Sequence, residues 1–471
     1  MRRIAIVGGG ISGLSAAFQL EKARAAGVEV EYRLFESAQR LGGSLYSDWV
    51  EDCLVEAGPD SFLTEKPWAV MLCKELGIAD QLIGSNDAQR KTYIVVKGRL
   101  VVMPDGLMFM VPTKILPTAF SPLFSWGTKL RMARELLHPP RPTEGDETVA
   151  ELVERHFGPE VVDRLADPLL AGVYGGDPSR LSARAVLPRF VKMEEDHGSL
   201  SRAMLGARKN MARNSAGRPP APLFTSLKDG MQEMVNAIVA RLDPAAIQLR
   251  SHIRRVYPED QSWKLSVEMK EEERFDAVIL ATPANVAGSL LEGVDRLLAR
   301  NLLDTTYSSS VTVTLGYYKD QLKKLPPGFG FLVPRSEGKR MLACTFVHNK
   351  FPHRAPADKG ILRCFLGGSR DEAALALTDD EMLETVRREL KEIVKLDARP
   401  IFSRIYRWRG AMAQYEPGHI ARVERIEKRV TEIPGLALAG NAFHGIGVPD
   451  CIRSGMQAAD SVVAAEVTSI P

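Results

Sequence analysis

The stretch Arg2-Arg3-Ile4-Ala5-Ile6-Val7-Gly8-Gly9-Gly10-Ile11-Ser12-Gly13-Leu14-Ser15-Ala16-Ala17 at the start of the chain decides the fold. An apolar run that predicts a β-strand leads into glycines spaced as Gly8-x-Gly10-x-x-Gly13, and small and apolar residues that favour a helix follow. In this pattern Gly8 allows the sharp turn, Gly10 lets the backbone approach a pyrophosphate, and Gly13 lets the helix pack closely on the strand. The helix N-terminus then faces the phosphate charge. We therefore predict dinucleotide binding; the alternative is an ordinary tight turn between a strand and a helix.

The second strand and the loop after it indicate which dinucleotide to expect. The predicted strand Val28–Phe35 ends at Glu36, whose carboxylate can accept hydrogen bonds from ribose hydroxyls. The run Arg40-Leu41-Gly42-Gly43-Ser44 follows. An NAD-binding unit does not require this second glycine pair, whereas two-domain flavoproteins carry a Glu-x-x-x-Arg-x-Gly-Gly run at this place. The sequence therefore favours FAD over NAD, with a plain turn at the second glycine pair as the alternative.

Composition and charge limit the classes of protein to consider. The chain has 471 residues, of which 45% are hydrophobic and 26% charged, so we expect a globular protein of two or three domains. A net charge of +3 is too small to indicate nucleic-acid binding, but it permits contact with an anionic membrane or ligand. The five scattered cysteines lack metal-ligand spacing, which indicates reduced thiols in a cytosolic protein and no metal site. The first strand begins at residue 2 and no apolar run is long enough to span a membrane, so we expect neither a signal peptide nor a transmembrane helix.

The pattern along the chain predicts an α/β (mixed α+β) fold in three parts. Strand signals fade between Pro104 and about Asn214, where helical periodicity predominates, and strands then resume, as in the buried run Phe275–Pro283. A separate mixed sheet is predicted at Val311–Tyr317, Gly330–Val333, Met341–Phe346 and Ile361–Phe365, covered by the amphipathic helix Asp379–Lys395. We assign a Rossmann-type nucleotide-binding domain threaded from three segments to residues 1–90, 228–290 and 400–471, a mixed-sheet domain to 91–104 and 291–399, and a helical insertion to 105–227.

Two segments of the helical insertion have two interpretations each. Leu107–Pro112 and Ile115–Trp126 are rich in large apolar side chains, are broken by prolines and have cations on both sides. They form either the core of the insertion, or a monotopic membrane patch or the mouth of an apolar channel. The stretch His197–Lys228 carries several cations and no acidic residue, and we interpret it as a basic surface loop that lipid head groups can contact.

The C-terminal region predicts a third contribution to the nucleotide site. The short apolar run Leu436–Asn441 is followed by Gly445-Ile446-Gly447-Val448-Pro449-Asp450 and a predicted helix, Cys451–Val467. Such a glycine-rich entry can aim backbone N–H groups and a positive helix end at a flavin. The chain has no Ser-His-Asp order, no His-Glu-x-x-His and no paired cysteines, and its histidines lie in settings typical of surface or structural residues. We therefore name no catalytic side chain and expect the flavin to carry the redox chemistry.

Five motifs spread over nearly the whole chain belong to one pattern. They are Gly8–Leu14, Ala57-Gly58-Pro59-Asp60-Ser61-Phe62, Ala171-Gly172-Val173-Tyr174-Gly175-Gly176-Asp177-Pro178, Phe351–Pro356 and Gly440–Cys451. Together they resemble the protoporphyrinogen oxidases, FAD enzymes of haem synthesis within the flavin amine oxidase-like superfamily. The glycine fingerprint alone is shared with amine oxidases and carotene desaturases, and the Gly-Val-Tyr-Gly-Gly-Asp-Pro run makes the resemblance specific.

The resemblance implies both an architecture and a reaction. The architecture is an FAD domain, a mixed-sheet substrate domain and a helical membrane-binding domain. The reaction is the six-electron oxidation of protoporphyrinogen IX to protoporphyrin IX through FAD, with O2 as acceptor and H2O2 as product. The protein would then lie in the cytoplasm, peripherally on the inner face of the cell membrane. A homodimer and hand-over of the product to ferrochelatase are further expectations.

The resemblance also implies which positions contact the cofactor. The matching residues are Gly8, Gly9, Gly10, Ile11, Ser12, Gly13, Glu36, Ser37, Arg40, Gly42, Gly43, Ala57, Gly58, Pro59, Asp60, Val256, Trp408, Gly440, Ile446, Gly447 and Val448. Val256 is apolar at a strand end, where it would flank the adenine. Trp408 would cover the isoalloxazine; the alternative is a tryptophan of the core.

For the substrate, the family clamps the macrocycle between apolar side chains. The matching positions are Leu332 and Phe365, while a third position, leucine in the plant enzymes, is Thr345 here and departs from the pattern. Gly175 and Gly176 would let the macrocycle approach the backbone.

A cation for a substrate propionate is expected before the strand that begins near Tyr93. Many relatives have an arginine there, and this chain has Thr92 instead, with Arg90 and Lys91 beside it. We predict that one of these two cations serves; a pair of surface cations is the alternative.

Other activities stay open at this point. A close relative oxidises coproporphyrinogen III to coproporphyrin III, and the two cations at 90–91 do not decide between the two porphyrinogens. An amine oxidase would need an aromatic cage and usually a lysine against the flavin, and the sequence offers neither clearly. A non-enzymatic flavoprotein would bind FAD that no porphyrinogen reduces.

Overall fold

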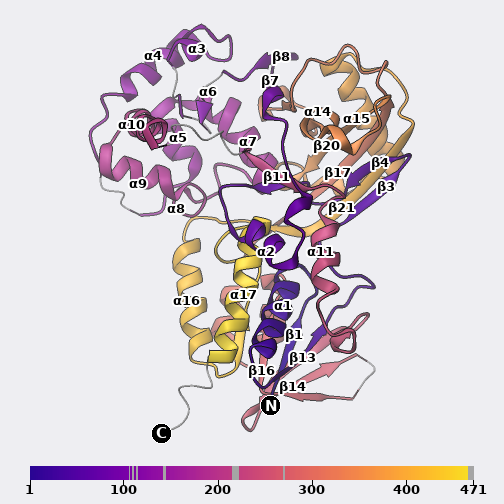
Figure 1. Cartoon of the computed structure of the whole chain (residues 1–471). Helices are drawn as coiled ribbons and strands as arrows, with labels where there is room; N and C mark the ends of the chain where they lie inside the picture. The colour runs from indigo at the N-terminus through magenta and orange to yellow at the C-terminus, as the bar shows by residue number, and fades with distance from the viewer. Residues whose placement is uncertain are drawn as a thin grey trace.

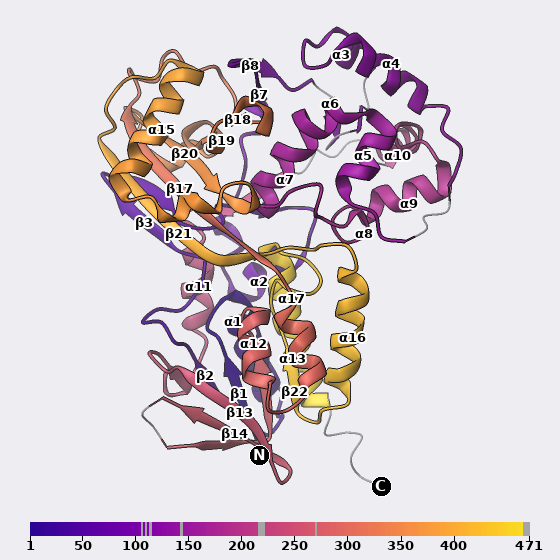
Figure 2. The same ribbon diagram turned by 180° about the vertical axis from the view of Figure 1, so that it is seen from behind.

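The computed structural model describes residues 1–104, 107–108, 111–112, 115–141, 145–214, 222–268 and 271–464. They form three regions that are easily separated in Figures 1 and 2. A parallel sheet and its helices lie at the bottom of Figure 1, a mixed sheet at the upper right, and a group of helices at the upper left. The prediction of a mixed α/β fold with a discontinuous nucleotide-binding part is confirmed.

The parallel sheet brings together distant parts of the chain. Its strand order is β12-β2-β1-β16-β22, with β1 at Arg2–Val7, β2 at Val30–Phe35, β12 at Ile247–Gln248, β16 at Ala277–Leu280 and β22 at Leu436–Leu438. Ile4 lies opposite both Tyr32 and Ala277, in parallel register. The carboxyl ends of all five strands therefore meet at one edge, which is where open α/β sheets bind ligands.

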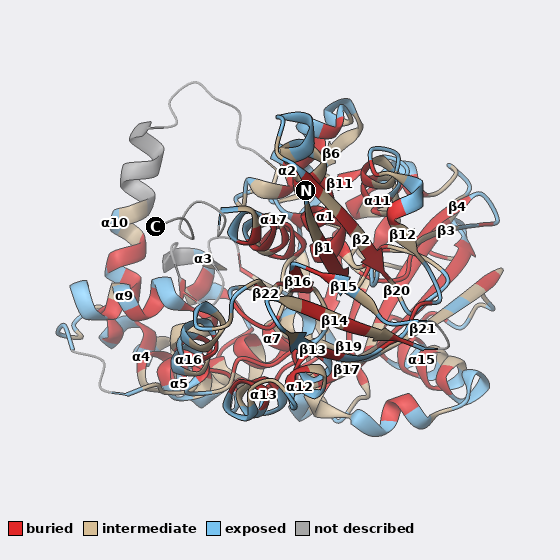
Figure 3. Cartoon of the chain, turned by 90° about the horizontal axis from the view of Figure 1, so that it is seen from below, coloured by how far each residue is buried: buried red, intermediate tan, exposed pale blue. Residues whose placement is uncertain are grey.

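Both faces of this sheet are covered, which explains why β1 is apolar from Ile4 to Val7. Ile4 and Ile6 pack with the helices α1 (Ile11–Ala25) and α17 (Val448–Ala464). Ala5 and Val7 face the other way, toward an antiparallel meander of β13 (Ile253–Glu259), β14 (Ser262–Val267) and β15 (Glu273–Phe275). Seen from below in Figure 3, most residues of β1 and β2 are accordingly buried, and β16 is buried throughout.

The mixed sheet has seven strands in the order β21-β17-β20-β19-β18-β7-β8. Their bounds are β7 Thr92–Val96, β8 Arg99–Val102, β17 Tyr307–Tyr318, β18 Gly330–Leu332, β19 Met341–Phe346, β20 Lys359–Gly367 and β21 Phe402–Ala413. The helix α15 (Asp379–Val394) covers one face, which carries Val311, Val313 and Leu315. The alternate residues of β17, such as Thr312 and Thr314, lie on the opposite face.

The strand β21 corrects one predicted boundary. The sequence analysis placed all of 400–471 in the nucleotide-binding domain and did not predict this strand. In the structure it is an edge strand of the mixed sheet, paired with β17 from Tyr307–Ala413 to Gly316–Phe402. It escaped prediction because Arg404, Arg407 and Arg409 interrupt its apolar pattern, as an edge strand allows.

The third region is helical, as predicted. It contains α3 (Ile115–Phe120), α4 (Trp126–Glu135), α5 (Val149–Phe157), α6 (Pro159–Val161), a π-helical turn (Val162–Ala166), α7 (Asp167–Tyr174), α8 (Ala183–Val186), α9 (Pro188–His197) and α10 (Leu200–Asn214). Part of the predicted apolar patch, residues 109–110, and part of the predicted basic loop, residues 215–221, lie outside the described residues.

Shorter elements join the three regions. They are β3 (Ser47–Val50), β4 (Cys53–Glu56), β5 (Phe62–Leu63), β6 (Leu82–Gly84), β9 (Leu107–Met108), β10 (Val111–Pro112), β11 (Phe224–Leu227), α2 (Trp68–Leu76), α11 (Gln232–Val239), α12 (Ala284–Leu291), α13 (Arg296–Leu303), α14 (Val347–Lys350) and α16 (His419–Thr431). Single 3-10 turns occur at Ala79–Gln81, Asp87–Gln89, Pro244–Ala246, Arg335–Glu337, Pro352–Arg354, Gly368–Arg370 and Glu372–Ala376. Within the described part of the chain, no helix combines the length and the apolar character that crossing a membrane requires.

Candidate functional site

The glycine loop at the end of β1 has the shape that its spacing predicts. Gly8 has a φ of +107°, which favours glycine, and its N–H donates to the carbonyl of Phe35 at 2.8 Å. A side chain at Gly13 would overlap the carbonyl oxygen of Gly8, so helix and strand can pack only with glycine there. A side chain at Gly10 would meet no atom within 4 Å. The open space therefore lies at the position where a phosphate was predicted to approach.

The residues after β2 fold back onto this glycine loop. The N–H of Gly9 donates to Glu36 Oε2 at 2.7 Å, and the N–H of Gly42 donates to the carbonyl of Gly9 at 2.8 Å. Arg40 Nη2 donates to the carbonyl of Gly43 at 2.6 Å. These contacts leave carboxylate lone pairs on Glu36, whose partly exposed side chain retains acceptor capacity for a ribose.

Further members of the predicted cofactor set, from the two ends of the chain, lie around the same edge. Ser37 Oγ donates to Glu36 Oε1 at 3.3 Å, and Ile11 and Ser12 form the first turn of α1. Gly440 follows β22, and its N–H donates to Ser454 Oγ at 3.1 Å. The helix α17 begins at Val448, directly after Ile446 and Gly447. The structure thus brings residues from both ends of the sequence to one sheet edge.

The turn Ala57–Asp60 joins the parallel sheet to the mixed sheet. A side chain at Gly58 would overlap the carbonyl of Ser44, next to the second glycine pair. From the other side, Trp408 Nε1 and Thr312 Oγ1 each donate to the carbonyl of Ala57 at 2.9 Å. Trp408 therefore reaches the predicted flavin turn from β21.

Strand register places the predicted substrate residues on the same face of the mixed sheet. Leu332 pairs with Ala343, which pairs with Phe365. Phe365 in turn pairs with Thr312, so these four positions form one row across the sheet.

The neighbouring rows of this face contain the other predicted positions. Thr345 pairs with Arg363 in one row, and Ser310 pairs with Trp408 in another. Because these rows are two residues apart along each strand, their side chains share the face that carries Thr312. We call this surface the site face.

The two glycines of the Gly-Val-Tyr-Gly-Gly motif have protein atoms where a side chain would project, and their expected approach to a macrocycle stays a prediction. A side chain at Gly175 would meet Ser308 Oγ at 2.9 Å and Met412 Sδ at 3.0 Å, and one at Gly176 would meet Gln414 Oε1 at 2.7 Å. Protein atoms already fill those spaces. The reason for glycine here is therefore the close packing of the helical region on β17 and β21.

The predicted propionate cations lie at the start of the site face. Arg90 is 51% exposed, with Nη1 3.8 Å from Asp87 Oδ2, and Lys91 is exposed. The strand β7 begins at the next residue and pairs with β18, where Ile94 lies opposite Leu332. Both cations are thus accessible, directly before the strand that neighbours Leu332.

Sequence reasoning missed a buried group of charged residues beside the flavin turn. Lys350 Nζ lies 3.1 Å from both carboxylate oxygens of Asp60, and Arg354 Nη2 lies 3.1 Å from Glu56 Oε1. Arg363 Nη2 donates to the carbonyls of Ala57 and Gly58. One signal was available: an arginine in the otherwise apolar strand Ile361–Leu366 needs a buried partner.

These neighbours keep Asp60 ionised. Burial alone would raise the pKa of this carboxyl group, but Lys350 and Arg363 outweigh it and hold the pKa of Asp60 well below its usual range. Asp60 therefore carries its negative charge over the whole physiological pH range.

Val256 lies away from the predicted substrate face. Its side chain is 3% exposed and packs with Phe35 in the core beside the meander. It also lines a cavity of about 500 Å³ between β13 and α12. Its expected contact with adenine stays a prediction.

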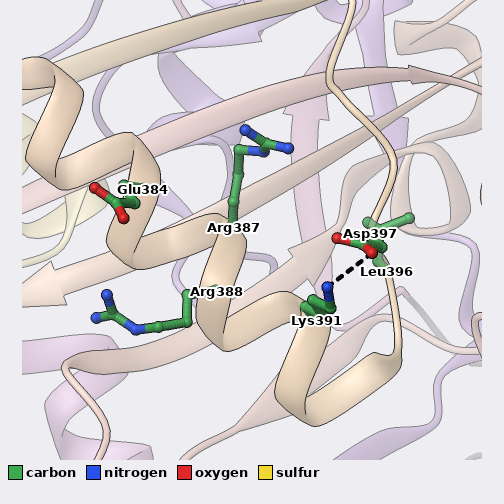
Figure 4. Close-up of a pocket in the computed structure, with 6 residues that line it drawn as sticks. All are labelled: Glu384, Arg387, Arg388, Lys391, Leu396 and Asp397. Carbon is green, nitrogen blue, oxygen red and sulfur yellow. Dashed lines mark ion pairs between the residues drawn. The ribbon is translucent and has the colours of Figure 1, made fainter.

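A second cavity lies on the outer surface of α15, on the covered face of the mixed sheet. It measures about 200 Å³, and Lys391 Nζ makes an ion pair of 2.8 Å with Asp397 at its rim (Figure 4). None of the predicted site residues lines it. It is a surface groove between charged side chains of the helix.

The helical region holds the one group among the described residues with metal-ligand spacing, Glu135, His138 and His156. Glu135 accepts hydrogen bonds from Ser199 Oγ at 3.0 Å and from the N–H of Leu200 at 2.6 Å. His156 has a carboxylate at each ring nitrogen. These partners explain the cluster as a hydrogen-bonded network of the helical core.

Comparisons with known proteins extend over the whole chain. Residues 11–463 match the family described as flavin containing amine oxidoreductase. The coproporphyrinogen III oxidase of Bacillus subtilis (strain 168) is 32% identical over 97% of each chain. Protoporphyrinogen oxidase 2 of Arabidopsis thaliana is 29% identical over 98% of this chain and 94% of the relative.

A solved structure agrees with these relatives. A chain from Exiguobacterium sp. 255-15, assigned as a protoporphyrinogen oxidase, superposes with a TM-score of 0.87 at 29% identity, over 98% of this chain and 99% of that one. The resemblance inferred from the motifs is thereby confirmed. The chain is a member of the flavin-containing amine oxidoreductase family, an oxidoreductase with FAD as its cofactor.

Proposed function

We propose that the protein oxidises a porphyrinogen, with FAD lying from the glycine loop of β1 to the turn Ala57–Asp60. The observation that supports this most directly is that the predicted flavin turn packs on the sheet face that carries Leu332 and Phe365. Relatives over the full length are named for the oxidation of such substrates. An apolar face against a flavin edge suits a flat, hydrophobic macrocycle.

The residues present fit FAD in three respects. Gly10 leaves space at the N-terminus of α1, where a diphosphate gains from backbone N–H groups. Glu36 has acceptor capacity for the ribose. Ile446 to Val448 lead into the N-terminus of α17, whose positive end favours electron density on the ring.

The chemistry that bound FAD supplies is transfer of electrons from the substrate to O2, which gives H2O2. The chain itself would bind and orient the substrate. Leu332 and Phe365 supply apolar contact, and Arg90 or Lys91 pairs with a carboxylate at the rim. Thr345 replaces an apolar wall with a hydroxyl group, so this part of the pocket differs from the plant pattern.

For the preferred substrate we propose coproporphyrinogen III. The relatives of at least 31% identity from Bacillus subtilis, Propionibacterium freudenreichii and the mycobacteria carry that name. Two adjacent exposed cations at 90–91 suit a substrate with more carboxylates. The sequence-based expectation of protoporphyrinogen IX becomes the second candidate, supported by the name of the Arabidopsis relative.

Steady-state kinetics with both porphyrinogens test this choice. We expect kcat/KM to be at least tenfold higher for coproporphyrinogen III, and replacement of Arg90 and Lys91 by alanine to raise its KM. A higher kcat/KM for protoporphyrinogen IX would assign the second candidate instead.

Contact with a membrane is a further part of the proposal. Phe120, Trp126 and Leu137 at α3 and α4 are 80%, 76% and 81% exposed, and Lys129 Nζ lies 4.4 Å from the ring of Trp126. Both helices lie at the outer end of the helical region (Figure 1). Exposed aromatic and aliphatic groups beside cations are typical of peripheral membrane binding at an anionic leaflet, such as the cytoplasmic one.

Flotation with anionic vesicles tests the membrane contact. We expect the protein to bind and the double variant Phe120→Ser, Trp126→Ser to lose binding. Equal flotation of the two proteins would contradict the membrane contact.

A homodimer and a hand-over to ferrochelatase stay predictions.

A further inference from the structure

The buried charged group beside the flavin turn contains more positive than negative charge. Its members are Glu56, Asp60, Lys350, Arg354 and Arg363, with side-chain exposures of 1%, 14%, 10%, 1% and 5%. We call it the junction cluster. Three cations face two carboxylates, and among the described residues no further carboxylate makes an ion pair with them. The cluster therefore carries one formal positive charge in excess, in a region largely shielded from water.

A buried charge without a compensating opposite charge costs free energy of folding. It is therefore useful to find where in the cluster the excess positive charge lies. Lys350 and Arg354 are turned toward the two carboxylates at 3.1 Å, whereas Arg363 Nη1 lies 4.0 Å from Asp60. The guanidinium group of Arg363 instead contacts the carbonyls of Ala57 and Gly58. The excess charge is thus concentrated at Arg363.

Arg363 also lies on the site face. It occupies β20 in the row of Thr345, and its guanidinium carbon is 4.9 Å from the ring centroid of Phe365. Its Nε is buried without a hydrogen-bond partner. Arg363 therefore lies between the turn Ala57–Asp60, which is proposed to hold the flavin, and the ring of Phe365, which is proposed to contact the substrate.

We propose that Arg363 is a positioning residue that fixes the turn Ala57–Asp60 on the mixed sheet and sets the junction cluster's single uncompensated positive charge beside the flavin ring. A cation at that place stabilises the more electron-rich, reduced form of the cofactor over the oxidised form. This inference rests on the proposed placement of FAD at that turn.

The test is the midpoint potential of FAD in the holoprotein, measured without any porphyrinogen. Arg363→Gln removes the charge, and we expect at least a tenfold loss of preference for reduced over oxidised FAD, which lowers a two-electron potential by about 30 mV. Arg363→Lys keeps the charge but loses the fork of donors to the two carbonyls. It should keep the potential near that of the native protein.

A matched control distinguishes the electrostatic effect of this charge on the potential of FAD from a general destabilisation of the protein. Arg370 is another buried arginine of the same domain, 8% exposed, and its guanidinium group pairs with Asp167 and donates to the carbonyl of Val333 rather than to the turn. Arg370→Gln should destabilise the protein without changing the potential. Lys350→Met removes a second cation of the junction cluster without touching the carbonyls of Ala57 and Gly58, and it should lower the potential as Arg363→Gln does.

Three results would overturn the inference. They are an unchanged potential in Arg363→Gln and Lys350→Met, equal shifts in Arg363→Gln and Arg363→Lys, or an equal shift in Arg370→Gln. If Arg363→Gln does not retain FAD, the other two variants still test the inference. The midpoint potential should fall in Lys350→Met and stay near the native value in Arg363→Lys. Failure of the native protein to oxidise porphyrinogens would contradict only the proposed substrate, because this measurement uses none.

Discussion

Gly10 and Gly13 are three residues apart, yet glycine is required for different reasons at the two positions. A side chain at Gly13 would overlap the backbone of Gly8, so the requirement is one of packing within the protein. A side chain at Gly10 would enter free space, so the protein alone sets no requirement there. We propose that the diphosphate of the cofactor occupies this space and accounts for the glycine.

This difference gives a prediction for two alanine variants. Gly10→Ala should change the free energy of unfolding of the apoprotein by less than about 1 kcal/mol, because its φ of −72° suits any residue, while FAD affinity falls at least tenfold. Gly13→Ala should destabilise the apoprotein by about 2 kcal/mol through overpacking and lose FAD as well. Denaturant unfolding of the apoproteins and FAD titration measure the two quantities. Equal FAD affinity of Gly10→Ala and the native protein would contradict the placement of the diphosphate.

At the scale of single residues, the sequence predicted features of the site where the residues concerned lie close together in the chain. The contacts of Gly8, Gly9 and Glu36 were readable because the glycine spacing and the acid at the next strand end are themselves short-range patterns. The pair of Asp60 with Lys350, and the contact of Arg363 with Gly58, join residues about 300 positions apart. No short-range pattern predicts such partners, so only the fold revealed them.

At the scale of elements, the helical region is held by an ionic network in its core. His156 on α5 lies 2.9 Å from Glu135 on α4 and 3.2 Å from Glu194 on α9. Burial alone would lower the pKa of His156, but the two carboxylates outweigh it and raise the pKa above its usual value. Burial alone would raise the pKa of Glu194, but its contacts with His156 and Arg155 outweigh burial and lower that pKa to about 2.

The signs of these shifts predict how stability depends on pH. The contribution of His156 is complete below its unfolded pKa of 6.5 and is lost as the pH rises through its higher folded pKa. The contribution of Glu194 is present above its unfolded pKa of 4.5 and is lost as the pH falls toward 2. We therefore expect the stability advantage of the native protein over His156→Gln to be largest near pH 5.5 and to shrink toward pH 9. Thermal unfolding of both proteins across this range checks the prediction, and a constant difference in Tm would refute it.

Elements were predictable from sequence to the extent that their pattern was regular. The strands β18 and β19 and the helix α15 follow clear patterns and were predicted at the right places. The strand β21 was not, because arginines interrupt it, and with it the correct boundary of the mixed sheet was missed. Pairing with β17, rather than its own composition, makes that segment a strand.

For the whole molecule, the question is what holds the three regions in one arrangement. Besides the junction cluster, Asp167 at the start of α7 pairs with Arg370 of the mixed-sheet domain, and both are less than 10% exposed. The adjacent motif residue Asp177 pairs with Arg335 at 2.6 Å. The motif that made the family resemblance specific thus sits beside the attachment of the helical region to the sheet.

Removing one charge of the buried pair should weaken this attachment. We expect Asp167→Asn to reduce the free energy of unfolding by about 3 kcal/mol, because Arg370 remains buried and unpaired. Glu416→Gln breaks an exposed pair with Arg180, which is 59% exposed, and should cost less than 1 kcal/mol. Urea unfolding compares the two variants, and similar losses in both would show that the buried pair does not attach the helical region.

The central claim is that one isoalloxazine ring, lying between the turn Ala57–Asp60 and the site face, takes electrons directly from a porphyrinogen. It is tested most directly by mixing the FAD-loaded protein with coproporphyrinogen III in the absence of oxygen. The account predicts loss of the oxidised-flavin absorbance together with the appearance of porphyrin fluorescence. FAD that stays oxidised with both porphyrinogens, although dithionite reduces it, would contradict the account.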